Sequence, residues 1–248
     1  MVNSTLNRTP ELELDEWIAK AEEAAQKGNF IVGNYTSAIR RVCQELGMPL
    51  PTERFGTISS VGYERLVVPM LEEARNSHYY EARRVLETAQ YWARDLFTEV
   101  PGEVGQDILL TTGRRLIDDS VTKAEESAQR GDYIAETFTY TIRNVCQELG
   151  IEVPIDRLQI VSEVGYRTLV EPLIAEARTL TERRLFYDAR EKLRAAQYHA
   201  EELFTEIPDN VRVPIERTIK EGIKKQEQTY YTAERDNPVQ RFLRYFKQ

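Results

Sequence analysis

A chain of 248 residues, with 41% hydrophobic and 30% charged residues, is long enough for one large or two ordinary domains with a charged surface. Its net charge of −8 argues against nucleic acid or an anionic membrane as a partner, because both attract excess basic charge. No apolar run approaches the roughly 18 residues that span a bilayer, and MVNSTLNRTPELELDEW lacks the apolar core of a secretory signal. Two cysteines exclude a disulfide framework, so we expect a cytoplasmic protein.

Residues 1–11 are polar, and we expect them to be disordered. A helical spacing of apolar residues begins at Leu12 and ends at Gly28, where a glycine can adopt the left-handed conformation that closes a helix. Asn29 can then cap the next helix with its side-chain oxygen. The stretch AEEAAQKGNFIVGNYTSAIRRVCQELG, Ala21–Gly47, therefore predicts two helices joined by a tight turn.

The same hairpin recurs as AEESAQRGDYIAETFTYTIRNVCQELG, Ala124–Gly150, with Gly131 and Asp132 at its turn. The second helix of each hairpin has an apolar face that we expect to be buried. Its residues are Ile31, Tyr35, Ile39, Val42, Cys43 and Leu46 in the first copy, and Ile134, Phe138, Ile142, Val145, Cys146 and Leu149 in the second. The pattern indicates an internal duplication.

A connector follows each hairpin. In it, Ser59 and Ser162 are expected to be helix N-caps. Pro69 and Pro172 stand within apolar stripes, so each must kink a helix or start a new one.

Long amphipathic helices are expected next, at Tyr79–Phe97 and at Leu185–Phe204. The second copy carries an insertion between about Arg178 and Tyr187, and its length is close to one helical turn. Such an insertion can lengthen a helix without rotating its core face.

We therefore predict an all-α fold, built as a tandem duplication of a helical-hairpin unit with a C-terminal helical capping segment. The predicted parts are repeat unit 1 at 12–105, repeat unit 2 at 106–211 and the capping segment at 212–248. The capping segment holds a degenerate third hairpin near Ala233–Val239. There, Asn237 is competent to cap a helix, and Pro238 occupies the favoured first helical position.

The hairpin pattern AxxxxGDYxxA loosely resembles a tetratricopeptide-type helical hairpin, although Gly33 stands where that motif has Ala. Residues 79–150 also resemble a small archaeal helical family, domain-of-unknown-function family 357. The similar positions are Val100, Pro101, the helix Arg114–Arg130, Gly131, Asp132, Tyr133, Ala135, Tyr140, Leu149 and Gly150. Thr141–Gln147 departs from the Gly-rich, His-containing stretch of that family. The resemblance implies a helical fold and an archaeal origin, and no activity.

Residue types that carry chemistry are sparse. Cys43 and Cys146 occupy equivalent positions in the two copies. Two thiolates without a nearby His are too few ligands for a zinc site, so we expect both cysteines to be small buried hydrophobic residues. His78 and His199 follow no metal-binding spacing and are expected on the surface. The chain has no phosphate loop and no nucleophile elbow. We therefore expect no catalytic residue, cofactor or metal, although enzymatic activity stays open.

Paired positions are candidates for a ligand or interface site. Gly62 and Gly165 indicate close helix approach, and Tyr63 and Tyr166 follow them. Three pairs of arginines also correspond between the copies: Arg40 and Arg143, Arg75 and Arg178, and Arg83 and Arg190. For these arginines, structural ion pairs with nearby Glu residues are favoured over an anion-binding site.

The tail residues Gln240, Leu243 and Phe246 resemble the peptide that docks onto replication sliding clamps, with Lys247 where a second aromatic belongs. The competing interpretation is the second helix of the third hairpin.

Three functions follow from these patterns. The favoured one is a non-enzymatic scaffold or adaptor that binds a protein partner, with homo-oligomerisation possible. The second is a small-molecule or nucleotide-type ligand protein, or an enzyme, that uses a cleft between the repeats. The third is a replication or repair accessory bound through the tail.

Overall fold

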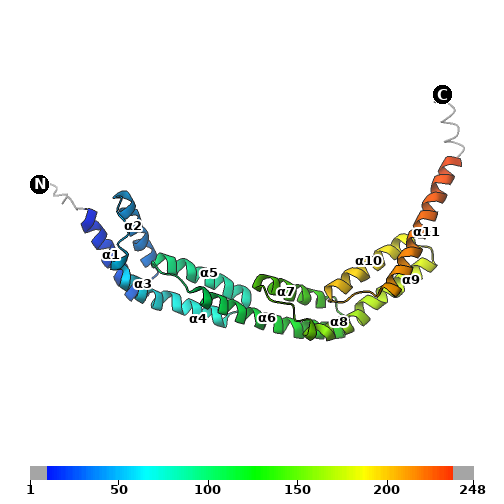
Figure 1. Ribbon diagram of the computed structural model, residues 1–248, viewed down its shortest axis with the longest axis horizontal. Helices are drawn as coiled ribbons and strands as arrows, with labels where there is room; N and C mark the ends of the chain where they lie inside the picture. The colour runs from blue at the N-terminus through cyan, green and yellow to red at the C-terminus, as the bar shows by residue number, and fades with distance from the viewer. Residues whose placement is uncertain (1–9, 237–248) are drawn as a thin grey trace, which may run out of the picture. The chain divides into compact units, whose positions relative to one another are not determined.

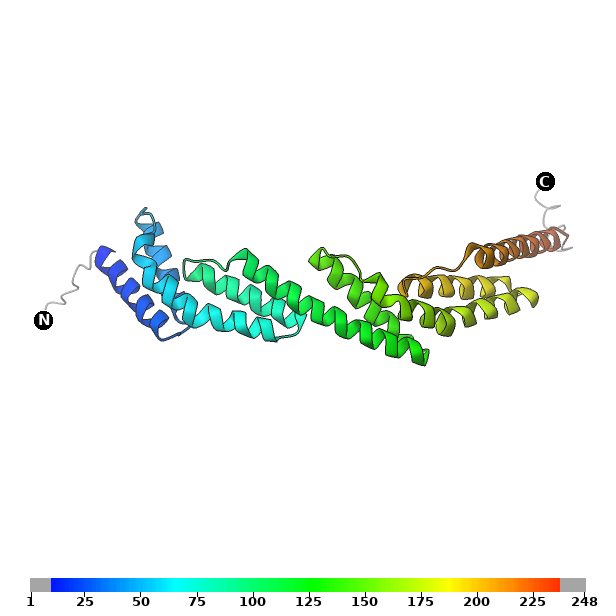
Figure 2. The same ribbon diagram turned by 60° about the horizontal axis from the view of Figure 1, so that its bottom comes forward.

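The computed structural model describes residues 10–236, which form helices joined by short turns and contain no strand (Figures 1 and 2). The predicted all-α class is therefore confirmed. Helix α1 (Pro10–Gln26) includes Pro10 and Glu11, so the N-terminal polar segment becomes helical slightly earlier than expected. Residues 1–9 and 237–248 lie outside the described part of the chain.

The chain divides into two compact units, unit 1 at Met1–Leu116 and unit 2 at Ile117–Gln248. The division falls inside one helix, α6 (Gly102–Arg130), whereas the sequence predicts a boundary after residue 105. This helix contributes its first half to unit 1 and its second half to unit 2. Each unit therefore contains part of a helix that also belongs to the other.

Unit 1 contains, besides the first half of α6, the helices α1, α2 (Val32–Glu45), α3 (Gly56–Gly62), α4 (Val68–Asn76) and α5 (Tyr79–Asp95). Helix α1 packs against α2 and α3, and α4 packs against α5. Their apolar faces meet in one core, whose fully buried members include Ile39, Phe55, Ile58, Leu96 and Ile108. Trp17 and Trp92 are half-buried at its edge.

Unit 2 contains, besides the second half of α6, the helices α7 (Ile134–Leu149), α8 (Gln159–Gly165), α9 (Glu171–Glu182), α10 (Phe186–Glu202) and α11 (Asp209–Asp236). Helix α10 packs against α9 and contacts α7, while α11 contacts both α9 and α10. In Figure 2, α11 lies alongside α10. The C-terminal segment is thus a helix over its described part, and the expected turn at Asn237 and Pro238 falls outside it.

The two hairpin turns use the same backbone geometry. Gly28 and Gly131 have φ angles of 62° and 66°, a left-handed conformation that glycine adopts without a steric penalty. The Asn29 side chain accepts a hydrogen bond from the Ile31 amide at 3.0 Å, and Asp132 accepts one from Ile134 at 3.0 Å. Each polar side chain therefore satisfies an amide at the entry of the next helix, as its cap-like position predicts.

The predicted core face of the hairpins is correct at the isoleucine, valine and cysteine positions of its middle part, and it is wrong at its start and at Leu46, which is exposed. Ile31 and Ile134 are exposed at the helix entry, and the buried positions near them are Val32 and Thr36 in unit 1, and Ala135 and Thr139 in unit 2. Each threonine hydroxyl donates to the backbone carbonyl three residues earlier, so its burial leaves no unpaired donor. Short side chains at these positions let the hairpin helices approach closely.

The connectors differ from the prediction at their serines. Ser59 and Ser162 lie within α3 and α8 rather than at their N-caps. Their hydroxyls instead donate to the carbonyl oxygens of Leu96 and Leu203, at 2.8 Å and 2.7 Å. Each serine therefore ties a short helix to the end of the long amphipathic helix of its unit.

The prolines start new helices after a wider turn of backbone. A π-helical segment, Tyr63–Val67 in unit 1 and Tyr166–Val170 in unit 2, precedes α4 and α9. Pro69 and Pro172 stand in the first turn of these helices, where a missing N–H costs no helical hydrogen bond. The chain can thus change direction at the prolines without leaving a buried carbonyl unpaired.

Candidate functional site

Arg40 and Arg143 each stabilise a strained helix end in their own unit. Arg40 donates to the Asp95 carboxylate at 3.2 Å and to the Arg94 carbonyl at 2.6 Å. Its guanidinium also lies 4.6 Å from the centroid of the Phe97 ring. Phe97 has a φ angle of 58°, which costs an L-residue about 1–2 kcal/mol.

Unit 2 repeats this arrangement. Arg143 donates to Glu202 at 3.2 Å and to the Glu201 carbonyl at 3.0 Å, and lies 4.8 Å from the Phe204 ring centroid. Phe204 has a φ angle of 55°. These contacts therefore support the structural ion pairs that the sequence favours for Arg40 and Arg143. Carboxylates of the same unit already compensate the charge of both guanidiniums.

The tyrosine and the second arginine of each unit lie on different helical segments. Tyr63 and Tyr166 are half-buried at the start of the π-helical segments, and burial raises the pKa of both phenols. Arg75 in α4 and Arg178 in α9 are exposed. Arg178 acts electrostatically on Tyr166, lowering its pKa against the larger effect of burial.

Both cysteines are buried and free, and burial raises the pKa of each thiol. No group of three or more His, Cys, Asp or Glu side chains is placed to bind a metal in the described part of the chain. The cysteines thus fit the prediction of small buried hydrophobes. The tail residues Gln240, Leu243 and Phe246 lie outside the described residues.

An exposed aromatic cluster lies next to each hairpin turn. In unit 1, Phe30 and Tyr91 are 49% and 59% exposed. Their ring centroids lie 4.9 Å and 5.7 Å from that of Trp92. We call Phe30, Tyr91 and Trp92 the unit-1 aromatic cluster.

The unit-2 aromatic cluster consists of the residues at the matching positions, Tyr133, Tyr198 and His199. Tyr133 and Tyr198 are 55% and 57% exposed. Their ring centroids lie 5.0 Å and 5.6 Å from the His199 ring. At the same place in both units, two exposed aromatic side chains thus each contact a partly buried ring, Trp92 in unit 1 and His199 in unit 2.

The two clusters differ at one buried contact beneath the exposed rings. In unit 1 the Trp92 ring covers Gly33, where an added Cβ would lie 2.8 Å from the ring. In unit 2 the matching residues are Glu136 and His199, whose carboxylate and Nδ1 form a short contact. Their side chains are only 13% and 17% exposed. The sequence prediction of a surface His199 is therefore wrong, because its ring is held against α7.

Burial of Glu136 raises the pKa of its carboxyl, while the hydrogen bond and charge of His199 lower it and the nearby charge of Glu202 raises it. The surrounding groups include Arg143, which neutralises Glu202 through its hydrogen bonds. This contact therefore links two helices, α7 and α10, of unit 2.

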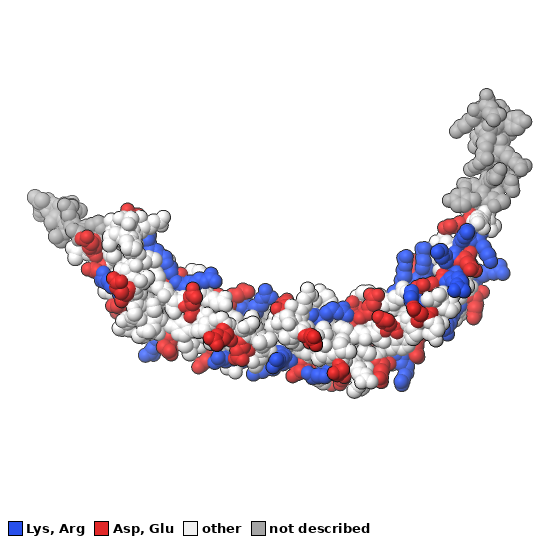
Figure 3. All heavy atoms as spheres, in the orientation of Figure 1, with Lys and Arg blue, Asp and Glu red and all other residues white. Residues whose placement is uncertain are grey.

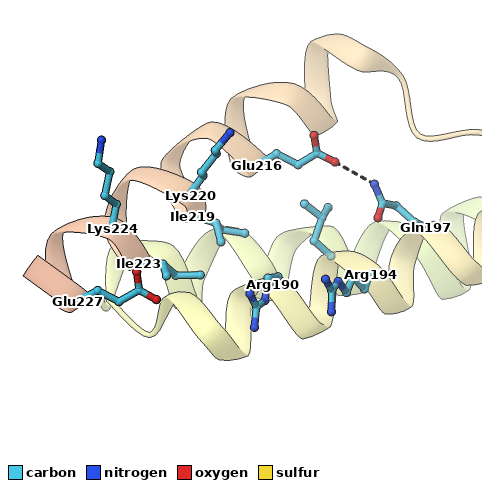
Figure 4. A pocket seen from close by; sticks show the side chains of 10 residues that line it. Arg190, Arg194, Gln197, Glu216, Ile219, Lys220, Ile223, Lys224 and Glu227 are labelled. Atoms are coloured by element: carbon cyan, nitrogen blue, oxygen red, sulfur yellow. Dashed lines mark hydrogen bonds between the residues drawn. The ribbon is translucent and has the colours of Figure 1, made fainter.

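A groove of about 390 Å³ lies between α10 and α11 in unit 2 (Figure 4). Its floor is apolar and is formed by Leu193, Ile219 and Ile223. In Figure 4 the side chains of Ile219 and Ile223 point from α11 toward α10. This volume is within the range of about 300–1,000 Å³ that is typical of ligand pockets.

Basic side chains flank this floor. Arg190 and Arg194 come from α10, and Lys220 and Lys224 come from α11. Figure 4 shows the two lysines extending away from the floor on the α11 side and the two arginines on the α10 side. Lys and Arg side chains also gather on this part of unit 2 in the space-filling view (Figure 3).

Carboxylates stand at the two ends of the groove, and both have partners. Glu216 accepts hydrogen bonds from Gln197 at 3.0 Å and from Arg212 at 3.0 Å. Glu227 accepts one from the Tyr187 hydroxyl at 3.2 Å. The buried Nε of Arg190, by contrast, has no hydrogen-bond partner. The groove is therefore net basic in a chain whose net charge is −8.

The sequence predictions did not include this groove, and of the eight paired Tyr and Arg candidates only Arg190 lines it. Among the described residues, no helix is both long enough and apolar enough to cross a membrane. Comparisons with protein-family models, with curated proteins and with solved structures found no match.

Proposed function

We propose that this protein is a non-enzymatic helical scaffold that binds a partner protein through its two aromatic clusters. The observation that carries the proposal is the recurrence, at matching positions of the two units, of two exposed aromatic rings that each contact a partly buried ring. Contiguous exposed apolar surface marks interaction sites, whereas single exposed apolar residues are normal. Tyrosine and tryptophan are also enriched in protein interfaces, because they offer large rigid contact area with a polar edge.

Two further observations support a binding role over a catalytic one. Arg40 and Arg143, the best candidates for an anion site, are occupied by carboxylates and carbonyls of their own units. The buried thiols of Cys43 and Cys146 have raised pKa values, which disfavours the reactive thiolate. The polar groups therefore serve mainly to hold the helices, and the exposed rings are left for recognition.

The test compares a variant that loses one exposed ring from each cluster with a control variant that loses one exposed ring elsewhere. Tyr91→Ser combined with Tyr198→Ser removes one exposed ring from each cluster. The control is Tyr140→Ser, because Tyr140 is 58% exposed on α7 and its match in unit 1 is Ser37. The full tagged chain is used to capture proteins from a lysate of its own cells.

We expect the wild type and the Tyr140→Ser control to capture the same proteins, and the double variant to lose them at unchanged helical content by circular dichroism. The proposal is wrong if the double variant captures the same proteins as the wild type. It is also wrong if the control loses them equally.

A further inference from the structure

We infer that the groove between α10 and α11 binds an acidic amphipathic helix of a partner protein. The inference shares with the proposed function the premise that the chain binds proteins. It concerns a different surface and adds the chemistry of the partner. The aromatic clusters take no part in it.

The shape of the groove favours a helical occupant. Its floor follows α11 from Glu216 to Glu227, about three helical turns or roughly 16 Å at about 1.5 Å per residue. A helix lying in such a groove would place apolar residues on the floor at i, i+3 or i+4, and i+7. The half-buried Ile223 supplies most of the accessible apolar surface, beside Leu193 and Ile219, which α10 and α11 already bury.

The charges of the groove favour an acidic occupant. Basic residues stand on both sides of the floor at a spacing of one helical turn, Arg190 and Arg194 on one side and Lys220 and Lys224 on the other. An amphipathic helix with Asp or Glu on both flanks of its apolar stripe meets both sides at once. The Arg190 guanidinium lies 5.2 Å from the Tyr187 ring centroid, and its Nε is buried without a hydrogen-bond partner. A carboxylate would satisfy this donor once the side chain turned toward the groove.

Three of these four charges are absent at the matching positions of the first copy. Arg190 matches Arg83, which lies 3.6 Å from the Glu87 carboxylate. In unit 2 the residue that matches Glu87 is Arg194, so this ion pair is replaced by two cations. Likewise, Lys220 matches Gly113 of α6. The basic groove is therefore a property of unit 2, and it arises where the two copies differ.

A flat anionic membrane fits this site less well. The apolar floor is recessed between two helices, where a lipid surface cannot reach it without deforming. A helix from a partner protein reaches both the floor and the flanking charges.

The experiment uses the full chain and a set of three designed fluorescent peptides. Each is a helix with a stripe of Leu flanked by Glu, and the stripe is shifted by one residue between peptides. Two comparison peptides carry Lys in place of Glu, or the same residues in scrambled order. Binding is measured by fluorescence anisotropy at two salt concentrations, and vesicles of phosphatidylserine are tested by co-sedimentation.

The groove variant is Arg194→Glu combined with Lys220→Glu. The first substitution copies the residue that unit 1 carries, and both side chains are exposed, so the fold should be kept. The control is Lys225→Glu, which makes one such charge reversal in α11 on the side away from the groove, next to Gly222. A second control, Tyr91→Ser with Tyr198→Ser, separates this site from the aromatic clusters.

We expect at least one Glu-flanked peptide to bind the wild type, to weaken at higher salt, and to lose about tenfold or more in affinity with the groove variant. Both controls should bind as the wild type does. The inference is overturned if no Glu-flanked peptide binds, if the Lys-flanked or scrambled peptides bind equally well, or if the groove variant matches the Lys225→Glu control. Sedimentation with vesicles in the absence of peptide binding would assign the groove to a membrane instead. If the peptide experiment fails while the tyrosine variants still lose their captured proteins, the inference about the groove is wrong and the proposed function stands.

Discussion

Replacing Gly62 with Ala should destabilise unit 1, although alanine is the better helix former. The backbone at Gly62 is helical, with φ −62° and ψ −41°, so alanine gains about 1 kcal/mol of helix propensity there. An added Cβ, however, would lie 2.7 Å from Leu96 Cδ2 and 3.4 Å from the Ala25 Cβ. Leu96 is fully buried, so its side chain can shift only by displacing its neighbours in the core. Overpacking of this kind costs about 1–3 kcal/mol, so we expect a net loss of about 1 kcal/mol.

Gly105→Ala is the matched control within the same unit. Gly105 also stands in a helix, but its added Cβ would lie 3.4 Å from Leu86 Cδ2, which is ordinary contact. We expect this variant to be stabilised by about 0.5–1 kcal/mol, since only the propensity changes. The two glycine variants should therefore differ in sign and by roughly 2 kcal/mol.

Urea unfolding followed by tryptophan fluorescence measures this difference in unit 1 alone. The chain has two tryptophans, and both Trp17 and Trp92 belong to unit 1. The midpoint should fall for Gly62→Ala and rise for Gly105→Ala, with unchanged slopes. If Gly62→Ala raised the midpoint as Gly105→Ala does, the close approach of Leu96 would not be what requires glycine at this position.

Two further predictions concern titratable groups of the buried contacts. Glu136 has a pKa raised above its ordinary value of 4.5, so the folded state holds the proton more tightly, and the free energy of unfolding should fall as the pH rises from 4.5 through the raised pKa. Glu136→Gln should flatten this fall, and His199→Ala should steepen it, because His199 lowers the pKa of Glu136. Urea titrations followed by circular dichroism at several pH values would check both expectations. Parallel profiles of unfolding free energy against pH for the wild type and Glu136→Gln would contradict the argument. Cys43 and Cys146 should react with a disulfide reagent far more slowly in the native chain than in urea, because both thiols are buried and burial raises their pKa. Equal rates with and without urea, followed by the absorbance of the released thiol, would show that these positions open readily.

Much of the helical frame is predictable because it depends on short-range patterns. Gly28 and Asn29 are next to each other in the chain, and the left-handed turn and the side-chain cap each need only local geometry. The close approach at Gly62 is also predictable, because a glycine inside a helix is costly unless another side chain needs the space. Ser59 was misassigned as an N-cap for the opposite reason. Its local preference for a cap was overridden by a hydrogen bond to Leu96, which is distant in sequence.

The buried Glu136–His199 contact and the groove were not predictable from either copy alone. In unit 1 the residues that match the contact are Gly33 and Trp92, so no polar pattern repeats. The usable signal was a paired change, in which a glycine and an aromatic residue in one copy became an acid and a base in the other. The groove depends on which side chains two helices direct toward each other, and sequence spacing does not fix that direction between helices.

The inserted turn in unit 2 has a consequence for how such a chain can evolve. Helix α9 has 12 residues, whereas its counterpart α4 has 9, and α11 contacts α9. Gln226 of α11 donates a hydrogen bond to the carbonyl of Arg184, in the turn that follows the lengthened helix, at 3.0 Å. A small insertion in one helix thus provides the support on which another helix rests. An insertion or deletion at that turn can move one side of the basic groove without altering any residue that lines it.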